Sequence, residues 1–444
     1  MLRVPAGSVE HELGMRCFAT DTPGLGGKLR TRPDDFVVQE LIRGPPPAEG
    51  GKVTVARVRL TNWENNHFLR EASRRLALPR ASIGFAGTKD KRAVTTQLFS
   101  FKAPVPRVLE RLGGIGGVEL LEAYAASKGI ALGDHDGNAF RVTIRCIEHD
   151  VEETQALVER CLGQLETLGG FPNYFGVQRF GVLRPVSHRV GKLLLRGQLK
   201  DAILEYVANP FEGEEEDAFA ARQTLASSGD YKQAFQNYPK KLVLEKAVLN
   251  HLAGYPDDHE GALRQLPKNL LLLFMHAYQS WLFNRVLSAR LEAGLPLGDV
   301  VVGDLAAPVE PVVETETANA FPVTDANVEK VRRLVAKRRA AATGPLMGHR
   351  ITFADGPMGK FERAVLAEEE VTPRDFLLDR MPELSSKGLR RILVAPVRNM
   401  SFDVAKDEMT PGSSKVTLSF TLSRGCYATC LARELMKADD ATAY

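Results

Sequence analysis

The sequence has few cysteines and no long apolar segment. Its 444 residues include 5 cysteines, an odd number with no Cys-x-x-Cys pair, which argues against a disulfide framework or a zinc ribbon and favours a reducing compartment. The longest apolar run, residues 270–275, is far shorter than the roughly 20 residues that span a bilayer, and the N-terminus has no apolar signal-peptide core. We therefore expect a protein of the cytoplasm, or of the nucleus if its cell has one, without membrane association.

The sequence also lacks a strong excess of charge of either sign. Lys and Arg number 58 and Asp and Glu 55, so the net charge of +3 does not by itself indicate a nucleic-acid partner. Any RNA-binding surface must come from basic residues gathered on one face. The content of 44% hydrophobic and 25% charged residues is typical of a globular protein, and the length favours two or three domains.

Residues 82–101 contain the most informative stretch of the chain. A short apolar segment at 83–86 and a β-branched and aromatic segment at 94–101 flank a loop with one acidic residue among basic ones. The acid is Asp90, and its basic neighbours Lys89, Lys91 and Arg92 are candidate RNA contacts. Neighbouring cations favour the ionised carboxylate, and a loop raised on two strands presents it to a partner, as a nucleophile beside RNA would require. The alternative is an ordinary β-hairpin with a solvated, charged tip.

Two stretches resemble signatures of one family. Gly-Phe-Ala-Gly-Thr-Lys-Asp-Lys-Arg-Ala-Val-Thr-Thr-Gln at 84–97 resembles the central signature of the TruD family of pseudouridine synthases, in which the acid is the catalytic aspartate. The resemblance implies that role for Asp90. Residues 29–40, Leu-Arg-Thr-Arg-Pro-Asp-Asp-Phe-Val-Val-Gln-Glu, resemble the first signature of the family, in which a basic residue precedes Pro-x-Asp-Phe-x-Val-x-Glu. The basic partner of the catalytic aspartate then falls at Arg30, which would otherwise be an ordinary surface residue of a strand.

A third stretch, Gly-Phe-Pro-Asn-Tyr-Phe-Gly-Val-Gln-Arg-Phe-Gly at 170–181, joins an amide, aromatic rings and an arginine in a glycine-bracketed turn. These groups can hold an extracted base by stacking and by hydrogen bonds to its edge. The stretch is similar to the family's Asn-Tyr-Phe-Gly-x-Gln-Arg-Phe-Gly, which implies Phe175 under the target uracil and Asn173 in the active site. The same resemblance makes Gln178 and Arg179 candidate RNA contacts, whereas the aromatics alone would be read as core.

The second half of the chain has a helical character with acidic loops. Residues 330–339 form the strongest charge cluster and predict a basic amphipathic helix. Its candidate phosphate contacts are Arg332, Arg333, Arg338 and Arg339. A solvated helix face explains the same pattern.

The pattern as a whole predicts an α+β fold. Strands and helices alternate in the first half, and residues 416–422 alternate again near the C-terminus, which indicates a mixed, mostly antiparallel sheet with helices packed on it. The TruD resemblance implies a catalytic domain of pseudouridine-synthase type in two parts, 1–195 and 384–444. A large, mainly helical inserted α+β domain would occupy 196–383.

The resemblance runs from about residue 30 to residue 436 and implies an isomerase, a tRNA pseudouridine synthase. The expected substrate is the uridine at tRNA position 13, with Asp90 as nucleophile, no metal, no organic cofactor and no obligatory protein partner. The alternative is an RNA-binding chaperone that keeps the fold without catalysis.

Overall fold

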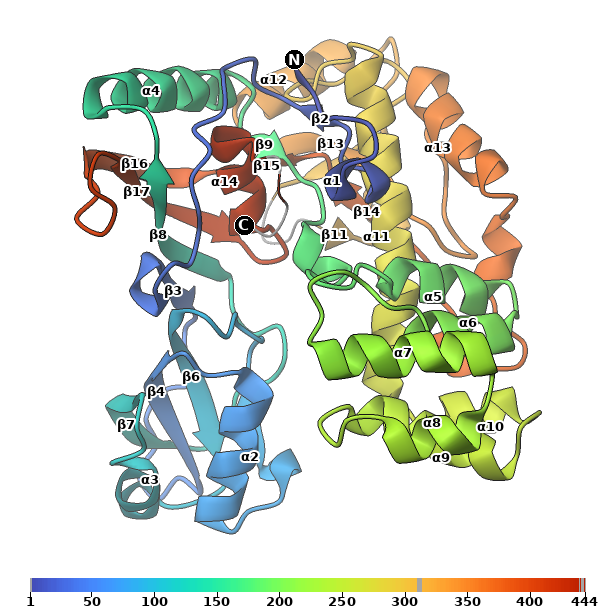
Figure 1. The fold of residues 1–444 in the computed structure, drawn as a ribbon. Coiled ribbons are helices and arrows are strands. Elements are labelled where there is room, and N and C mark those ends of the chain that lie inside the picture. Colours follow the sequence, from blue (N-terminus) through green and yellow to red (C-terminus); the bar gives the residue numbers. More distant parts are fainter. Residues whose placement is uncertain (1, 310–313, 439, 441–442, 444) are drawn as a thin grey trace.

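The structure, a computed structural model, describes residues 2–309, 314–438, 440 and 443. A large sheet and the helices on it form one side of the molecule, and a mainly helical region forms the other (Figure 1). The eight-stranded sheet has the order β16-β17-β8-β3-β6-β4-β7, with β5 paired to β6. Its strands are β3 (Phe36–Leu41), β4 (Val53–Thr61), β5 (Ile83–Phe85), β6 (Val94–Phe101), β7 (Val118–Ala126), β8 (Gly137–Ile147), β16 (Arg398–Lys406) and β17 (Ser414–Ser423).

Neighbouring strands of this sheet run antiparallel except β3 and β6, which are parallel. The prediction of an α+β fold with a mixed, mostly antiparallel sheet is therefore confirmed. The expected hairpin is also present, because β5 and β6 pair antiparallel with Phe85 opposite Phe99. Their connection, residues 86–93, carries Asp90.

Helix α2 (Asn65–Leu76) shows how the sequence builds this half. Its apolar residues Phe68, Leu69, Ala72 and Leu76 follow helical spacing and are buried in one apolar cluster with β4, β6 and α3 (Val105–Leu112). The Glu64 carboxylate caps its first turn by accepting hydrogen bonds from the backbone N–H groups of Asn66 and His67. Helix α4 (Val151–Thr167) contacts β16 and β17 farther along the sheet.

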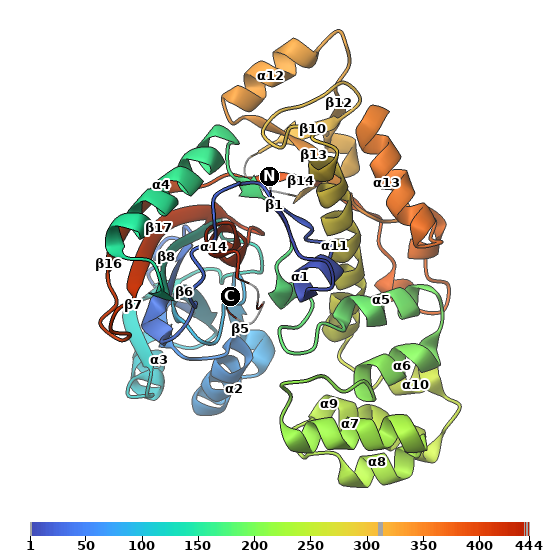
Figure 2. The same cartoon turned by 45° about the horizontal axis from the view of Figure 1, so that its top comes forward.

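The second half of the molecule surrounds the long helix α11 (Lys268–Glu292), which lies between the helices and a five-stranded sheet (Figure 2). That sheet has the order β11-β14-β13-β10-β12. Its strands are β10 (Leu305–Pro308), β11 (Glu314–Thr315), β12 (Phe321–Pro322), β13 (Ala340–Leu346) and β14 (Leu389–Ile392). The helices are α5 (Ser187–Leu195), α6 (Leu199–Val207), α7 (Glu216–Ser228), α8 (Tyr231–Asn237), α9 (Val243–Gly254), α10 (His259–Leu263), α12 (Val328–Ala336) and α13 (Gly356–Glu368).

The two halves are joined through short strands. Strand β14 pairs with β13 in the second half, and two residues later β15 (Val394–Ala395) pairs with β9 (Phe171–Pro172). Residues 389–392 thus lie with the smaller sheet, beyond the domain boundary predicted at 384, which remains a prediction. Gly170 permits the β9–β15 approach, because a Cβ there, at φ +147°, would lie 2.0 Å from the carbonyl oxygen of Ala395.

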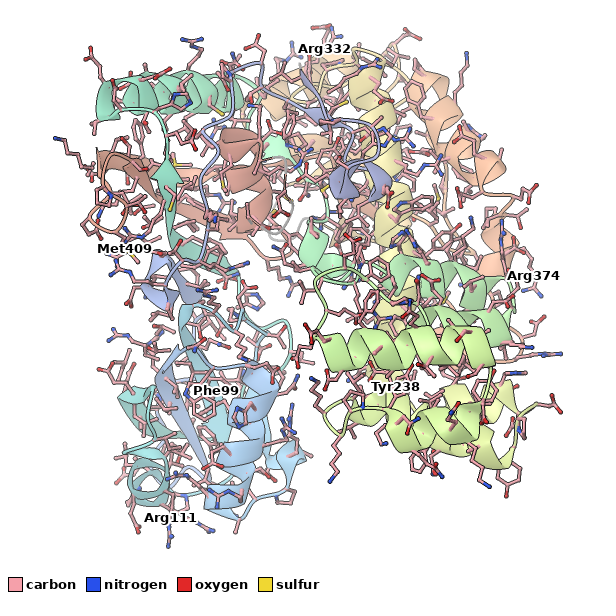
Figure 3. The ribbon with its side chains drawn as sticks, viewed as in Figure 1. Phe99, Arg111, Tyr238, Arg332, Arg374 and Met409 are labelled. Carbon is pink, nitrogen blue, oxygen red and sulfur yellow. The ribbon has the colours of Figure 1, made fainter. Side chains whose placement is uncertain are left out.

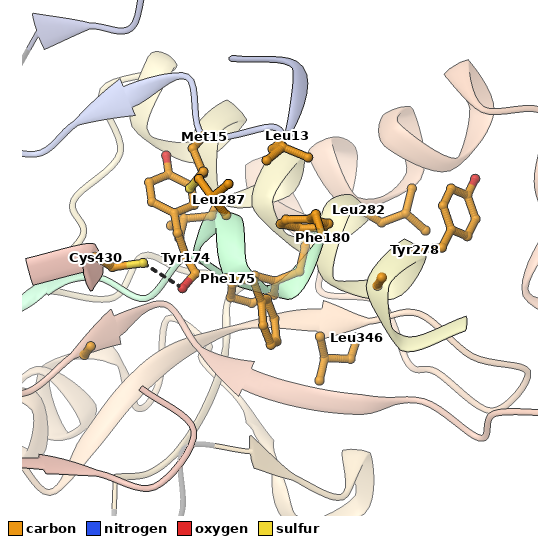
Figure 4. Packing of buried hydrophobic residues seen from close by; sticks show 14 of the residues in the cluster. Leu13, Met15, Tyr174, Phe175, Phe180, Tyr278, Leu282, Leu287, Leu346 and Cys430 are labelled. Atoms are coloured by element: carbon orange, nitrogen blue, oxygen red, sulfur yellow. Dashed lines mark hydrogen bonds between the residues drawn. The ribbon is translucent and has the colours of Figure 1, made fainter. Parts of the chain in front are cut away.

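One apolar core continues through this junction. Figure 4 shows Phe175 and Phe180 in it together with Leu346 and Leu287, and the Sγ of Cys430 in contact with the carbonyl oxygen of Tyr174. Cys430 belongs to α14 (Ala428–Met436), the last described helix. Among the described residues, no helix is both long and apolar enough to cross a membrane.

Candidate active site

A cleft of about 460 Å³ lies where the Asp90 loop meets the turn before α14. This volume is in the range of small-ligand sites. Its walls come from the segment before β3, from β3, from the loop after β5, from β8 and from the turn at 425–429. The polar side chains that line it are Arg30, Thr88, Lys89, Asp90, His135, Asn138, Gln178, Tyr427 and Thr429.

Arg30 and Asp90 meet in this cleft. The Nη2 of Arg30 lies 3.3 Å from the Oδ1 of Asp90, and the side chains are 14% and 43% exposed. The guanidinium also lies over the ring of Phe36, 4.2 Å from its centroid. Arg30 adopts a left-handed backbone conformation with φ 54°, which is uncommon for a residue with a side chain. The structure thus brings together the two residues that the sequence paired, and leaves the carboxylate open to a ligand.

The neighbouring Lys89 also lines the cleft, but its ammonium is buried. Its Nζ lies 2.7 Å from Oε1 of Glu40 on β3, and these side chains are 6% and 0% exposed. The second oxygen of Glu40 accepts a hydrogen bond from the backbone N–H of Leu98 on β6. Lys89 was predicted as an RNA contact, but the structure places its ammonium on a buried carboxylate, where it fixes the loop. Lys91 and Arg92, the other two bases, are exposed.

Three titratable groups that line the cleft, His135, Cys426 and Tyr427, are neutral near pH 7. Burial, followed by the charge of Lys89, lowers the pKa of His135, so its imidazole is uncharged near neutral pH. Burial raises the pKa of the Cys426 thiol to about 11 and that of the Tyr427 phenol above its ordinary value. Asp90 and Arg30 are therefore the charged pair that faces this cleft beside the buried Lys89.

Asn173 and Phe175 lie behind the cleft wall and are not among the described residues that line it. Asn173 is 0% and Phe175 5% exposed. The ring of Phe175 packs edge to face against that of Tyr427, with centroids 5.9 Å apart, and Tyr427 itself lines the cleft. The structure thus brings both predicted residues to the back of the site, one ring removed from the space that a ligand can enter.

Gln178 lines the cleft and Arg179 lies beside it. The Oε1 of Gln178 accepts a hydrogen bond from Thr429, which leaves its amide nitrogen for other partners. Arg179 donates to Ser280 of α11, and its guanidinium carbon lies 5.9 Å from the centroid of the Phe175 ring.

The four candidate phosphate contacts of the second half are far in sequence from the residues of the cleft. They lie on the outer surface of the molecule. Arg332 and Arg333 belong to α12 (Val328–Ala336). The helix predicted for residues 330–339 ends at Ala336, so Arg338 and Arg339 lie beyond it. All four are exposed. Figure 3 shows Arg332 at the edge of the molecule, and its side chain pairs with Glu329 at 2.9 Å and Asp299 at 3.5 Å.

Three site residues escaped the sequence analysis. Glu40 reads as part of an ordinary strand. Arg391, which donates to the Oδ1 of Asn173 at 2.6 Å behind the cleft, reads as one basic residue of another strand. Tyr427 had a visible signal, because it stands in a Gly-Cys-Tyr turn between a regular strand and the terminal helix. An aromatic residue in such a turn could have been weighed as a ligand contact.

Comparison with known proteins finds relatives over nearly the whole chain. A family model described as tRNA pseudouridine synthase D (TruD) matches residues 12–435. The chain is 39% identical over 431 residues to a protein of Methanosarcina mazei named a probable tRNA pseudouridine synthase D, covering 97% of this chain and 98% of that one. A protein with the same name in Halobacterium salinarum is 35% identical over 448 residues and covers 97% of each chain.

A solved structure shares the whole fold. The crystal structure of the TruD protein of Methanosarcina mazei superposes with a TM-score of 0.83 at 37% identity, and the match covers 100% of both chains. With an extended family match, relatives above 30% identity and a common fold, the chain belongs to the tRNA pseudouridine synthase D (TruD) family.

Proposed function

We propose that this protein isomerises a uridine of tRNA, the one at position 13, to pseudouridine, with the Asp90 carboxylate as nucleophile. The observation that carries the proposal is the Arg30–Asp90 pair, an accessible carboxylate held 3.3 Å from a guanidinium inside a cleft. The family of the chain and the names of its relatives supply the substrate class.

The reaction requires mainly a nucleophile and a site that encloses the uracil ring. The bond between N1 of uracil and C1′ of ribose breaks, the ring turns, and a bond from C5 to C1′ replaces it. The proton that leaves C5 is balanced by one taken up at N1, so no oxidant, reductant or group donor is required. Asp90 attacks either C1′ or the pyrimidine ring, and both routes place the same carboxylate oxygen against the nucleoside.

The base must leave its stack to reach Asp90, at a cost of about a few kcal/mol. Stacking in the site offsets that cost, and Phe36, Phe140 and Tyr427 are the aromatic residues that line the cleft. The Phe175 ring packs against Tyr427, with centroids 5.9 Å apart, and under the Arg391 guanidinium. Stacking a base directly on Phe175 therefore requires one of these side chains to move, a change of the kind that binding sites often make. We assign Asn173 the support of this wall and Gln178 an edge contact with the base.

The RNA backbone would be held outside the cleft. Lys91 and Arg92 are exposed beside Asp90 and can meet phosphates next to the target nucleotide. Arg179 is a candidate for the same role from the other wall. We place a second group of phosphate contacts at Arg332, Arg333, Arg338 and Arg339, which would engage a more distant part of the tRNA.

The variant Asp90→Asn tests the nucleophile. It keeps the size of the side chain but removes its charge, so we expect tRNA affinity to change less than about threefold. Pseudouridine formation, measured on an unmodified tRNA transcript, should fall by at least about 10³-fold. Asp34→Asn, at an exposed aspartate before β3, is the matched control and should retain activity.

Two outcomes would overturn the proposal. Product from a well-folded Asp90→Asn variant would remove Asp90 as nucleophile. Binding of tRNA by the parent protein without any pseudouridine would favour the chaperone alternative. A transcript with cytidine at position 13 tests the site of modification, and undiminished product from it would refute that position.

A further inference from the structure

Arg391 on β14 occupies a central place behind the cleft. Its side chain is fully buried, and its guanidinium donates to three partners from distant parts of the chain. It donates to the Oδ1 of Asn173 at 2.6 Å and the carbonyl oxygen of Asn173 at 3.3 Å. It also donates to the carbonyl oxygen of Gly425 and to the Oε1 of Glu314, each at 2.8 Å. One rigid group therefore ties the predicted base-binding amide to the turn that lines the cleft.

The same guanidinium lies over the ring of Phe175. Its central carbon is 4.2 Å from the ring centroid, a distance that permits both cation–π attraction and planar stacking. Arg391 therefore contacts Asn173, Phe175 and the turn before Tyr427. Lysine could keep the charge, but its single ammonium cannot reproduce the planar fork or the stacking.

Arg390, the preceding residue, provides an internal comparison. Its side chain is equally buried, but alternation along β14 sends it to the opposite face. There it donates to the Oε1 of Glu362 at 2.8 Å and to the carbonyl oxygen of Thr343 at 2.7 Å. Both of those partners belong to the second half of the molecule. Each buried guanidinium is costly to leave unpaired, so each fixes what surrounds it.

We propose that Arg391 is a positioning residue through which the smaller sheet sets the place of Asn173, Phe175 and the 425–427 turn relative to Asp90. Strand β14 is hydrogen-bonded to β13 and β11, so the backbone that carries Arg391 is fixed by the second half of the molecule. Its side chain then orders the wall of a cleft whose nucleophile stands on the larger sheet. This inference rests on the proposed function for its kinetic consequence and on geometry alone for its structural one.

The test compares Arg391→Lys with Arg390→Lys in the full chain. Both replace a buried fork by a point charge, so both should lower the melting temperature. Only Arg391→Lys should lower the rate of pseudouridine formation in a single turnover at saturating tRNA, by at least about tenfold, with tRNA affinity within about threefold of the parent. Arg390→Lys should keep the rate within about threefold of the parent.

Amide hydrogen exchange gives a readout that does not depend on activity. Arg391→Lys should speed exchange at residues 425–427 and around Asn173, whereas Arg390→Lys should speed it around Thr343 and not at that turn. Equal loss of rate in the two variants, or unchanged exchange at 425–427 in Arg391→Lys, would overturn the inference. If the parent protein forms no pseudouridine, the proposed function fails, and the exchange comparison still decides the role of Arg391.

A milder variant covers the case in which Arg391→Lys does not fold. Glu314→Gln removes one charged partner of Arg391 at a side chain that is 35% exposed, so the fold should survive. We expect faster exchange at 425–427 and a rate lowered about threefold. No change in either measurement would count against the proposed role.

Discussion

The loop at 86–93 and strand β14 place charged side chains at the same site by different means. In the loop, Lys89 turns inward to Glu40 and Asp90 turns outward to Arg30. In β14, two adjacent arginines also face opposite ways, but both are fully buried. The alternation of a strand directs Arg390 and Arg391 without help, whereas a loop has no such period. In the loop, the buried Lys89–Glu40 pair fixes the residue that precedes Asp90.

The difference in burial also separates charged residues that can contact a ligand from charged residues that stabilise the fold. Asp90 is 43% exposed and free to meet a ligand, so its pair with Arg30 should add little to stability. The buried pairs behave differently, because removing one partner leaves a charge in a medium of low polarity. Variants of the two classes should therefore separate activity from stability.

The largest expected effect on stability is that of Glu40→Gln. It leaves the Lys89 ammonium buried beside a neutral amide, and we expect the free energy of unfolding to fall by about 3 kcal/mol. Urea unfolding measures this change. Glu119→Gln, in the exposed pair with Arg59, should cost less than about 1 kcal/mol. Similar losses in the two variants would mean that Lys89–Glu40 does not anchor the loop.

His188 on α5 extends the comparison to a buried histidine beside the cations Arg189 and Lys192. Burial lowers its pKa to about 3, and the nearby Arg189 and Lys192 act in the same direction. The unfolded chain binds a proton at this imidazole below its ordinary pKa while the folded chain does not, so stability is lost as pH falls from about 6.5 towards 3. This group should lower the free energy of unfolding by about 2 kcal/mol between pH 8 and pH 5.

The variant His188→Gln checks that prediction. Urea unfolding across the same pH range should show a shallower acid loss than in the parent protein. His67→Gln, at an exposed histidine of α2, is the control and should keep the parent's slope. Identical slopes for the parent and His188→Gln would show that His188 does not titrate in this way.

Arg30→Lys tests the outward half of the loop. Lysine keeps the charge but loses the fork and the stacking on Phe36, so we expect about tenfold slower pseudouridine formation. Because the pair is partly exposed, stability should change by less than about 1 kcal/mol. Arg32→Lys, in the exposed pair with Glu408, should affect neither property. An unaltered rate in Arg30→Lys would separate Arg30 from the chemistry.

The smallest expected effect is that of removing the exposed arginines of the second half, and it concerns tRNA binding. Replacing the four candidate phosphate contacts by glutamine should weaken tRNA binding and lower the slope of log affinity against log salt by about 0.7–0.9 per lost contact. The variant carries changes at Arg332, Arg333, Arg338 and Arg339. Arg374→Gln, at another exposed arginine, is the control. An unchanged slope would exclude RNA contact at this surface.

Local pattern was enough to predict several elements. The hairpin of β5 and β6 and the alternating strand β17 follow from the pattern of apolar residues. Strand β13 shows where the sequence pattern does not predict a strand. All seven of its residues are buried, and its Ala-Ala-Ala-Thr-Gly-Pro-Leu sequence does not alternate between apolar and polar residues. Burial on both faces removes the contrast between apolar and polar positions that marks a strand.

The sequence by itself determined the resemblance to the TruD signatures, the loop that presents Asp90 and the alternating strand near the C-terminus, because these depend on residues close together in the chain. Only the tertiary structure decided that Lys89 is buried on Glu40, that Tyr427 stands in front of Phe175, and that Arg391 binds Asn173 across 218 positions of sequence. Such contacts depend on how sheets and helices pack. Local propensity carries no information about which distant side chain fills the space beside a buried charge.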